Sequence, residues 1–311
     1  MTLQYNFNST NRTLLPFFFY AIGLVGKHVK AACMPKRHFN WDETKYLIAF
    51  GDSYTFVQGT AGYPNFSFIG SYLPGQFSFP PGTLPSNEIA QNFTDTAEGG
   101  PNWVEYLTGC GLEPGETLPQ DCDIQLWNFA FAGADISLRY LRQHHDFTTP
   151  LVNQTQQYLT WAEPVIGKDM DESKALVAFW IDINDINDSS RFTGVSFPAF
   201  YNELIDTMFT QSVQPMYVAG YGSFLETMIG WWANSLARHS NMFAEKNRGV
   251  TAMVYDANKF LNDVLDDPEA FGIKNTTSYR LDYADPDVLE RPELHGCLPL
   301  DEYFWYNSGH M

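Results

Sequence analysis

Residues able to carry out nucleophilic chemistry stand directly after apolar segments of strand length. Ser53 follows the apolar run 46–50, and Gly133 and Asn184 follow two later runs. His310 stands near the end of the printed sequence. A serine hydroxyl can attack an ester carbonyl when an imidazole takes its proton, and a glycine N–H and an asparagine amide can donate to the resulting oxyanion. These residue types predict serine-dependent ester hydrolysis. A lone Gly-Asp-Ser is also common in turns and helix N-caps, so the prediction depends on the other residues.

The elements that must position these residues alternate between strand-like and helix-like patterns. The expected strands are 46–50, 124–130, 175–181 and 250–255. The expected helices are 101–108, 135–142, 149–161, 197–213, 226–247 and 257–265, the third of them ending before Pro164. This alternation predicts an α/β fold with a mainly parallel, doubly wound sheet. Ligands of such sheets bind at the carboxyl ends of the strands, where Ser53, Gly133 and Asn184 fall.

Composition and charge narrow the classes of function. The 311 residues fit one large domain, and 18 basic against 36 acidic residues give a formal net charge of −18. No run rich in Lys or Arg is present, and the acidic chain would repel a phosphate backbone, so nucleic-acid binding is not expected. The sequence contains neither a Cys-x-x-Cys nor a His-x-x-x-His spacing, so no structural zinc site is expected. His144 and His145 follow an expected helix, where they favour a helix C-terminal cap over a metal site. The composition does not indicate an oligomeric state.

The first residues indicate a secretory route. Residues 14–26 form an apolar run of signal-peptide length, which is short for a bilayer span, so residues 1–32 are interpreted as a signal peptide. A short membrane anchor at this place is the alternative. The expected product is a secreted protein without a stable membrane partner, with its catalytic domain at residues 45–311. Glycosylation sequons support this route, at Asn8, Asn11, Asn65, Asn92, Asn153, Asn187 and Asn275.

The chain has four cysteines. Cys110 and Cys122 flank a loop rich in Gly and Pro, and they are candidates for a disulfide in an oxidising compartment. Cys297 has no local partner in the sequence.

Four sequence blocks resemble, in order, those of the SGNH or GDSL hydrolases. They are Gly51-Asp52-Ser53-Tyr54, residues 128–134, residues 182–186 and residues 303–310. The resemblance implies that Ser53 is the nucleophile, that His310 is base and then acid, and that Ser53, Gly133 and Asn184 form the oxyanion hole. Residues 267–277 are similar to a stretch of fungal carbohydrate esterase family 16 acetylesterases. That branch implies a three-layer α/β/α fold, no cofactor, and hydrolysis of esters, often acetyl groups on oligosaccharides.

The sequence departs from the pattern of that family in four places. Asp182 replaces a usual glycine, and Asn307 replaces a usual aspartate, although its amide oxygen can still accept the imidazole N–H and fix the tautomer. Asp301 is an alternative carboxylate at an awkward distance. An apolar strand after Gly220 is cut short, and the printed sequence ends one residue after His310. The pattern therefore leaves open a sheet without one central strand and a domain without a C-terminal helix.

Three functions follow from these patterns. The first is an acetylesterase that acts on a small ester or an acetylated oligosaccharide. The second is a lipase or lysophospholipase on the same scaffold, with the aromatic-rich segment 58–100 binding acyl chains. The third is a catalytically impaired carbohydrate-binding protein, because Asp182 and Asn307 depart from the usual site.

Overall fold

The computed structural model describes most of the chain beyond residue 38. The described residues are 39–59, 91–97, 100–113, 116–144, 148–228, 233–283, 285, 288, 291, 294 and 296–311. The chain divides into Met1–Met34 and Pro35–Met311, and every described residue belongs to the second unit. The expected signal segment 1–32, the sequon at Asn65 and most of the aromatic-rich segment 58–100 lie outside the described residues.

A five-stranded parallel sheet organises the second unit. Its strands lie in the order β5 (Gln125–Asn128), β1 (Tyr46–Gly51), β6 (Ala175–Trp180), β7 (Ser223–Thr227) and β8 (Thr251–Tyr255). Of these five strands, the first in the sequence, β1, thus lies between the second, β5, and the third, β6. This order is that of a doubly wound sheet, whose ligands bind where the order of the strands reverses, between β1 and β6. The expected α/β fold is confirmed.

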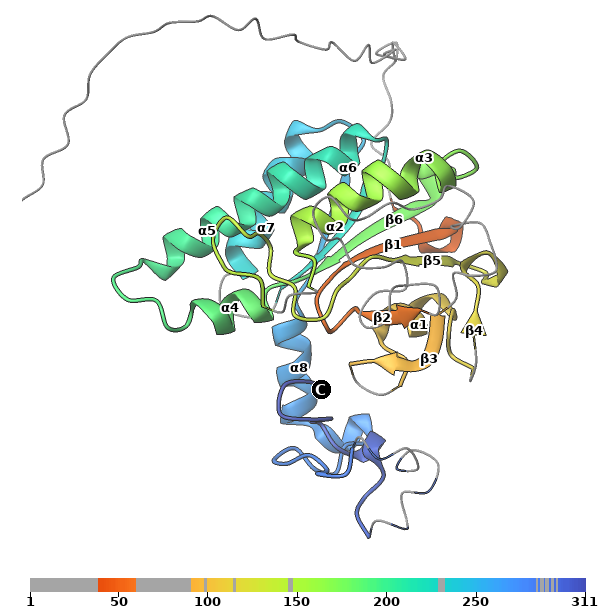
Figure 1. The fold of residues 1–311 in the computed structure, drawn as a ribbon, viewed down its shortest axis with the longest axis vertical. Coiled ribbons are helices and arrows are strands. Elements are labelled where there is room, and N and C mark those ends of the chain that lie inside the picture. The colour runs from red at the N-terminus through yellow and green to blue at the C-terminus, as the bar shows by residue number, and fades with distance from the viewer. Residues whose placement is uncertain are drawn as a thin grey trace, which may run out of the picture. The chain divides into compact units, whose positions relative to one another are not determined.

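Both faces of the sheet are buried, because successive residues of a strand point to opposite faces. In β1, Ile48 and Phe50 face one core cluster, and Leu47 and Ala49 face the other. The first cluster is covered by α2 (Leu151–Gln157), α5 (Phe197–Met208) and α7 (Ala233–Lys246), and the second by α1 (Trp103–Thr108). Figure 1 shows these helices on the two sides of the sheet, which makes a three-layer α/β/α arrangement.

Two helices continue past a proline, Pro164 in the first and Pro215 in the second. The sequence predicts that the first helix ends before Pro164. After α2, a π-helical turn at Tyr158–Ala162 leads into α3 (Glu163–Ile166), which contains Pro164. In the same way, α5 passes through a π-helical turn at Phe209–Val213 into α6 (Gln214–Val218). A π-helical turn changes the local hydrogen-bond pattern and so accommodates a residue that has no N–H to donate. The expected helix end before Pro164 is therefore wrong.

Two further expectations need correction. Residues 226 and 227 belong to β7 and not to a helix, because β7 pairs with β6 on one side and with β8 on the other. The described sheet therefore has no missing central strand. The expected helix 135–142 is a series of turns. Asp135 is buried there, and the Ile136 N–H donates to the Asp185 carboxylate, while the Asp135 and Ile136 carbonyls accept from the N–H groups of Leu151 and Val152.

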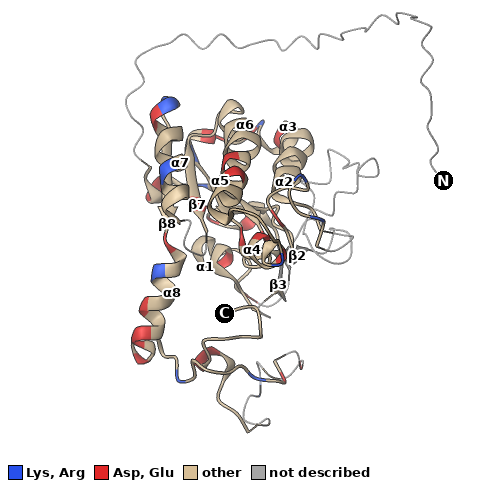
Figure 2. Cartoon of the chain, turned by 90° about the vertical axis from the view of Figure 1, so that its left-hand side faces the viewer, with Lys and Arg blue, Asp and Glu red and all other residues tan. Residues whose placement is uncertain are grey.

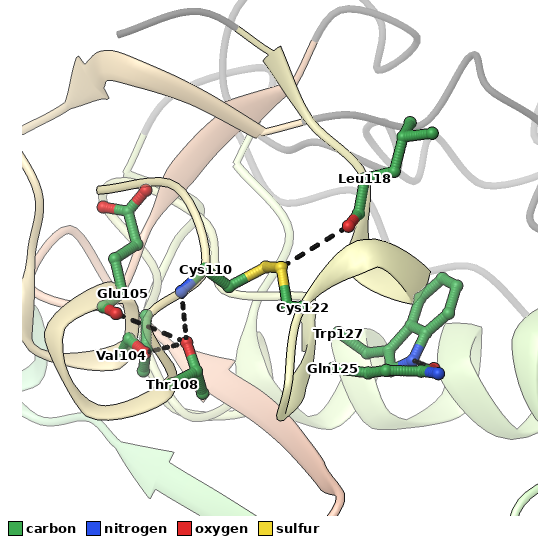
Figure 3. The surroundings of a disulfide bond; sticks show 8 residues. All are labelled: Val104, Glu105, Thr108, Cys110, Leu118, Cys122, Gln125 and Trp127. Atoms are coloured by element: carbon green, nitrogen blue, oxygen red, sulfur yellow. Dashed lines mark hydrogen bonds between the residues drawn. A yellow bond between two sulfur atoms is a disulfide. The ribbon is translucent and has the colours of Figure 1, made fainter. Parts of the chain in front are cut away.

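A small antiparallel sheet and a disulfide lie beside α1. The strands of this sheet are β2 (Val57–Gly59), β3 (Gln91–Thr96) and β4 (Glu116–Thr117). Cys110, just after α1, is joined to Cys122 with a Cα–Cα distance of 5.4 Å (Figure 3). Next to it, the Thr108 hydroxyl donates to the Val104 carbonyl and accepts from the Cys110 N–H. The disulfide thus connects the end of α1 to the segment that enters β5.

The described chain is acidic and has no candidate membrane span. Lys and Arg segments are few and lie on separate elements, among them α7 and α8 (Ala257–Asp266), while Asp and Glu are spread widely (Figure 2). Among the described helices, none combines the length and the hydropathy that a bilayer crossing requires.

Candidate active site

The turn after β1 is shaped by a glycine and by a buried glutamine. A Cβ atom on Gly51 would lie 2.0 Å from the Trp180 carbonyl oxygen, so only glycine allows β1 and β6 to approach this closely. The Gln154 side chain of α2 accepts from the Gly51 N–H at 3.0 Å and donates to the Gly51 carbonyl at 2.8 Å. These contacts fix the end of β1 and therefore the place of Ser53, two residues later.

Ser53, His310 and Asn307 form a hydrogen-bonded chain. The Ser53 Oγ lies 2.8 Å from His310 Nε2, and His310 Nδ1 lies 3.1 Å from Asn307 Oδ1. The same Oδ1 accepts from the N–H groups of Gly309 and His310, so it is the amide oxygen that faces the imidazole. Nδ1 must then carry a proton, which leaves Nε2 as the acceptor for the Ser53 hydroxyl. Asp301 is exposed and is not the partner of this imidazole.

The loop that carries Asn307, Gly309 and His310, called the histidine loop, is held to the domain by Tyr54. The Tyr54 hydroxyl donates to the Gly309 carbonyl at 3.0 Å, and its ring centroid lies 5.3 Å from that of His310. Trp180 stacks on the Tyr54 ring, with an angle of 7° between the two ring planes. Further along the loop, the Trp305 indole N–H donates to the Thr276 carbonyl. These contacts hold His310 against Ser53, although it is the penultimate residue of the sequence.

Asn184 lies at the site, and Gly133 lies next to it. Asn184 lines the same cavity as Ser53 and His310, at the start of α4 (Ile183–Ser189). Its side-chain amide donates to the Ala134 carbonyl at 3.0 Å, which places the Gly133–Ala134 turn beside it. Gly133 has φ +75° and is buried, and it is not among the residues that line the cavity. The structure thus brings together Ser53, His310, Asn307 and Asn184. Gly133 directly precedes Ala134, the residue whose carbonyl accepts from Asn184.

The cavity holds about 570 Å³ and includes residues to which the sequence assigned no role beside Ser53. His144 is one of them, and its Nδ1 lies 2.9 Å from Asp188 Oδ2. It is therefore not a helix cap, because no helix precedes it. Asn258 and Asn262 of α8, and Trp305 of the C-terminal loop, also line the cavity. A helical spacing of four residues was the available signal for the α8 pair, but only the fold shows which face of α8 meets Ser53.

Buried carboxyl groups surround the turn of the nucleophile. Burial raises the pKa of Asp52 to about 7, and the N–H groups of Tyr54, Asp182 and Ile183 offset part of this rise. Burial also raises the pKa of Asp135 to about 8, with the charges of Asp188 and Asp52 adding to the effect. The pKa of Asp185 is raised by burial and by the Asp135 charge. For all three groups, burial favours the neutral carboxyl in the fold relative to the unfolded chain.

The other sequence candidates have mixed positions. Asn92 lies on β3, Asn153 on α2 and Asn275 in the C-terminal segment, while Asn187 is exposed on α4 and lines the cavity of Ser53. A glycan on Asn187 would therefore stand at the entrance of this cavity. Within the described part of the chain, no cluster of three or more His, Cys, Asp or Glu side chains could hold a metal ion.

Asn307→Asp is expected to raise kcat/KM for p-nitrophenyl acetate about 5- to 30-fold on its pH plateau. A hydrogen bond to a charged group exceeds a neutral one by roughly 1–2 kcal/mol, and the carboxylate would stabilise the imidazolium that forms in the transition state. Burial lowers the pKa of His310, and the base must be neutral, so the acid limb of the wild-type profile falls below pH 6.5. The added carboxylate raises this pKa, so the limb moves to higher pH.

A pH profile of kcat/KM from pH 4 to 9 measures both effects. Asn307→Gln is the matched neutral control, because it keeps an amide but displaces it from Nδ1. An Asn307→Asp profile with an unmoved acid limb would contradict the role of Asn307 as the partner of His310.

Comparison with known proteins agrees with the chemistry of this site. No protein-family model matches the chain. An acetylesterase from Thermothelomyces thermophilus is 24% identical over 269 residues, which cover 77% of this chain and 79% of that protein. An acetylesterase from Hypocrea jecorina is 21% identical over an alignment of 328 residues, which covers 89% of this chain and 86% of that protein. The two similarities support an acetylesterase-like relationship and the hydrolysis of carboxylic esters.

Proposed function

We propose that the protein is a secreted serine esterase that removes acetyl groups from carbohydrate-type alcohols. The observation that carries the proposal is the 2.8 Å contact between Ser53 Oγ and His310 Nε2, with the imidazole oriented by Asn307. The four sequence blocks of the SGNH type and the similarity to two acetylesterases support the same assignment. Secretion is supported by the apolar run 14–26, by the sequons and by the disulfide.

In the proposed reaction, Ser53 Oγ attacks the acyl carbon while His310 Nε2 takes its proton. The carbonyl oxygen becomes an oxyanion, to which the Ser53 and Gly133 N–H groups and the Asn184 amide donate. The C–O bond to the alcohol then breaks, and the imidazolium returns the proton to the leaving oxygen. Water attacks the acetyl-serine in the second half of the reaction, with His310 again as base, and releases acetate and free Ser53. None of these steps uses a cofactor.

A second candidate is an esterase for longer acyl chains. A groove of about 590 Å³ with almost entirely apolar side chains lies between α1, β7, β8 and α8, and Leu261 lines both this groove and the cavity of Ser53. Its residues include Trp103, Trp180 and Phe260. Turnover that rises from the acetyl to the octanoyl ester of p-nitrophenol would favour this candidate over the acetylesterase.

A fluorophosphonate probe tests the proposed chemistry directly. We expect covalent labelling of the folded protein at Ser53, read by peptide mass spectrometry, together with hydrolysis of p-nitrophenyl acetate. The probe needs an activated serine, so labelling also separates an enzyme from an impaired carbohydrate-binding protein. Labelling at another residue, or none in a folded preparation, would contradict the assignment.

A further inference from the structure

One face of α8 lines the cavity of Ser53 and has no place in the proposed reaction. The residues on this face are Asn258, Leu261, Asn262 and Leu265, which follow the spacing of a single helical face. The helix begins at an Asp256 cap, whose carboxylate accepts from the Lys259 N–H. In Figure 1, α8 lies beside the C-terminal end of the chain, which contributes His310 to the same cavity.

The two α8 amides are arranged as one donor and one acceptor. The Asn262 Nδ2 donates to the Asn258 carbonyl at 2.7 Å and to Asn258 Oδ1 at 3.1 Å, so both of its hydrogens are used. Both side chains are exposed, and within the described part of the chain neither the Asn258 NH2 group, a donor, nor the Asn262 Oδ1, an acceptor, has a protein partner. The bond between the two side chains also fixes their relative position.

A neighbouring donor and acceptor match two adjacent hydroxyl groups. One hydroxyl of a vicinal diol can accept from the Asn258 NH2 while the next donates to Asn262 Oδ1. Among the described residues that line the cavity, none is a Lys, Arg, Asp or Glu, and two are histidines, His144 and His310. The lining therefore suits a neutral polyol better than an anion or a cation.

Trp305 supplies the apolar surface that a sugar ring needs. Its indole N–H donates to the Thr276 carbonyl at 3.1 Å, which holds the ring in place, and the residue lines the cavity with Leu261 and Leu265. The C–H faces of a pyranose can pack on such a surface while its hydroxyls bond to amides. The leaving oxygen must lie within reach of His310 Nε2, and the loop of His310 also contains Trp305.

We propose that Asn258 and Asn262 bind a vicinal diol of the leaving alcohol, which makes the substrate a monoacetylated pyranoside with two adjacent free hydroxyls. This inference rests on the proposed function, because it assigns the alcohol side of the same ester. It adds the residues that select the alcohol, which the Ser53–His310 chemistry does not specify.

The test compares two acetate esters in two variants. Monoacetylated methyl β-xylopyranoside with a free diol is compared with p-nitrophenyl acetate, and the ratio of their kcat/KM values is measured. Asn262→Leu keeps a similar volume but removes the acceptor, and we expect this ratio to fall about tenfold. Asp263→Leu is the matched control, since Asp263 lies on the same helix and is not part of the cavity lining. We expect it to leave the ratio unchanged.

A deoxy substrate makes the assignment specific. Removing the diol hydroxyl that donates to Asn262 should lower kcat/KM about tenfold in the wild type and little in Asn262→Leu, because the two changes remove the same bond. Independent effects, or an unchanged ratio in Asn262→Leu, would overturn the diol site while p-nitrophenyl acetate turnover left the esterase in place. If no ester were turned over, calorimetric titration of the same xylosides would replace kinetics, and equal affinities of the wild type and Asn262→Leu would overturn the site.

Discussion

Ser53→Ala is expected to lower kcat for p-nitrophenyl acetate by about 10³- to 10⁶-fold, the range seen when a nucleophile of a serine hydrolase is removed. The reason is local, because Ser53 Oγ is the atom that contacts His310 Nε2. Ser53 is 9% exposed, and its Oγ has room in the cavity, so alanine removes one oxygen without disturbing the core. Initial rates at saturating ester and the far-UV circular dichroism spectrum measure the two parts of this expectation.

Ser308→Ala is the control for this loss, because Ser308 lines the same cavity from the exposed side of the histidine loop. Its rate should stay within a few-fold of the wild type. The paired variants separate loss of a reacting oxygen from a general effect of removing a hydroxyl at this cavity. A folded Ser53→Ala protein that retained more than a few per cent of the wild-type kcat would show that another group attacks the ester.

The alternation of strands and helices could be predicted from the sequence because the strands of the parallel sheet are buried on both faces. Segments such as 46–50 and 175–181 are continuous apolar runs, and their alternation with helices indicates a parallel sheet. Ser53 could be located for the same reason, since it follows the first of these runs. His310 could be found only through the order of the sequence blocks, because 257 positions separate it from Ser53.

Other features depend on contacts that no local pattern contains. Residues 226 and 227 read as the start of a helix, but pairing with β6 and β8 on both sides extends the strand to Thr227. The turns at 135–142 are tied to α4 by the bond from the Ile136 N–H to the Asp185 carboxylate, 49 positions away in the sequence. Asn258 and Asn262 show a helical spacing, yet the face that meets Ser53 is set by the packing of α8 and the C-terminal loop. Tertiary contacts decided each of these cases.

Asp182, which stands where the pattern has a glycine, adopts strained backbone angles that the sequence alone does not show. Asp182 has φ +139° and ψ −20°, and it is the non-glycine residue with positive φ in the described chain. Side chains at such angles cost about 1–3 kcal/mol because Cβ meets the neighbouring carbonyl oxygens. The residue stands between β6 and α4, so its angles are set by the turn that leads to Asn184. A glycine at this place would meet no such cost.

Asp182→Gly is accordingly expected to raise the free energy of unfolding by about 1–2 kcal/mol. Relief of the φ strain is partly offset by the greater freedom of glycine in the unfolded chain, which costs roughly 0.5–1 kcal/mol. Asp182 is 1% exposed, and its charge raises the pKa of the buried Asp185, so its removal also takes a carboxylate out of the core. Urea unfolding at pH 7 gives the free energy, and the rate with p-nitrophenyl acetate should not fall.

Asp182→Ala separates the two contributions to this gain. Alanine removes the carboxylate but keeps the Cβ atom, so the difference between the alanine and wild-type proteins reports the buried carboxylate together with its interactions. The difference between the glycine and alanine proteins reports the backbone strain, and it should favour glycine by about 1 kcal/mol. An alanine variant more stable than the glycine variant by about 0.5–1 kcal/mol, the cost of glycine's freedom in the unfolded chain, would show that the positive φ at residue 182 carries no strain. The cost of this departure would then lie in its carboxylate alone.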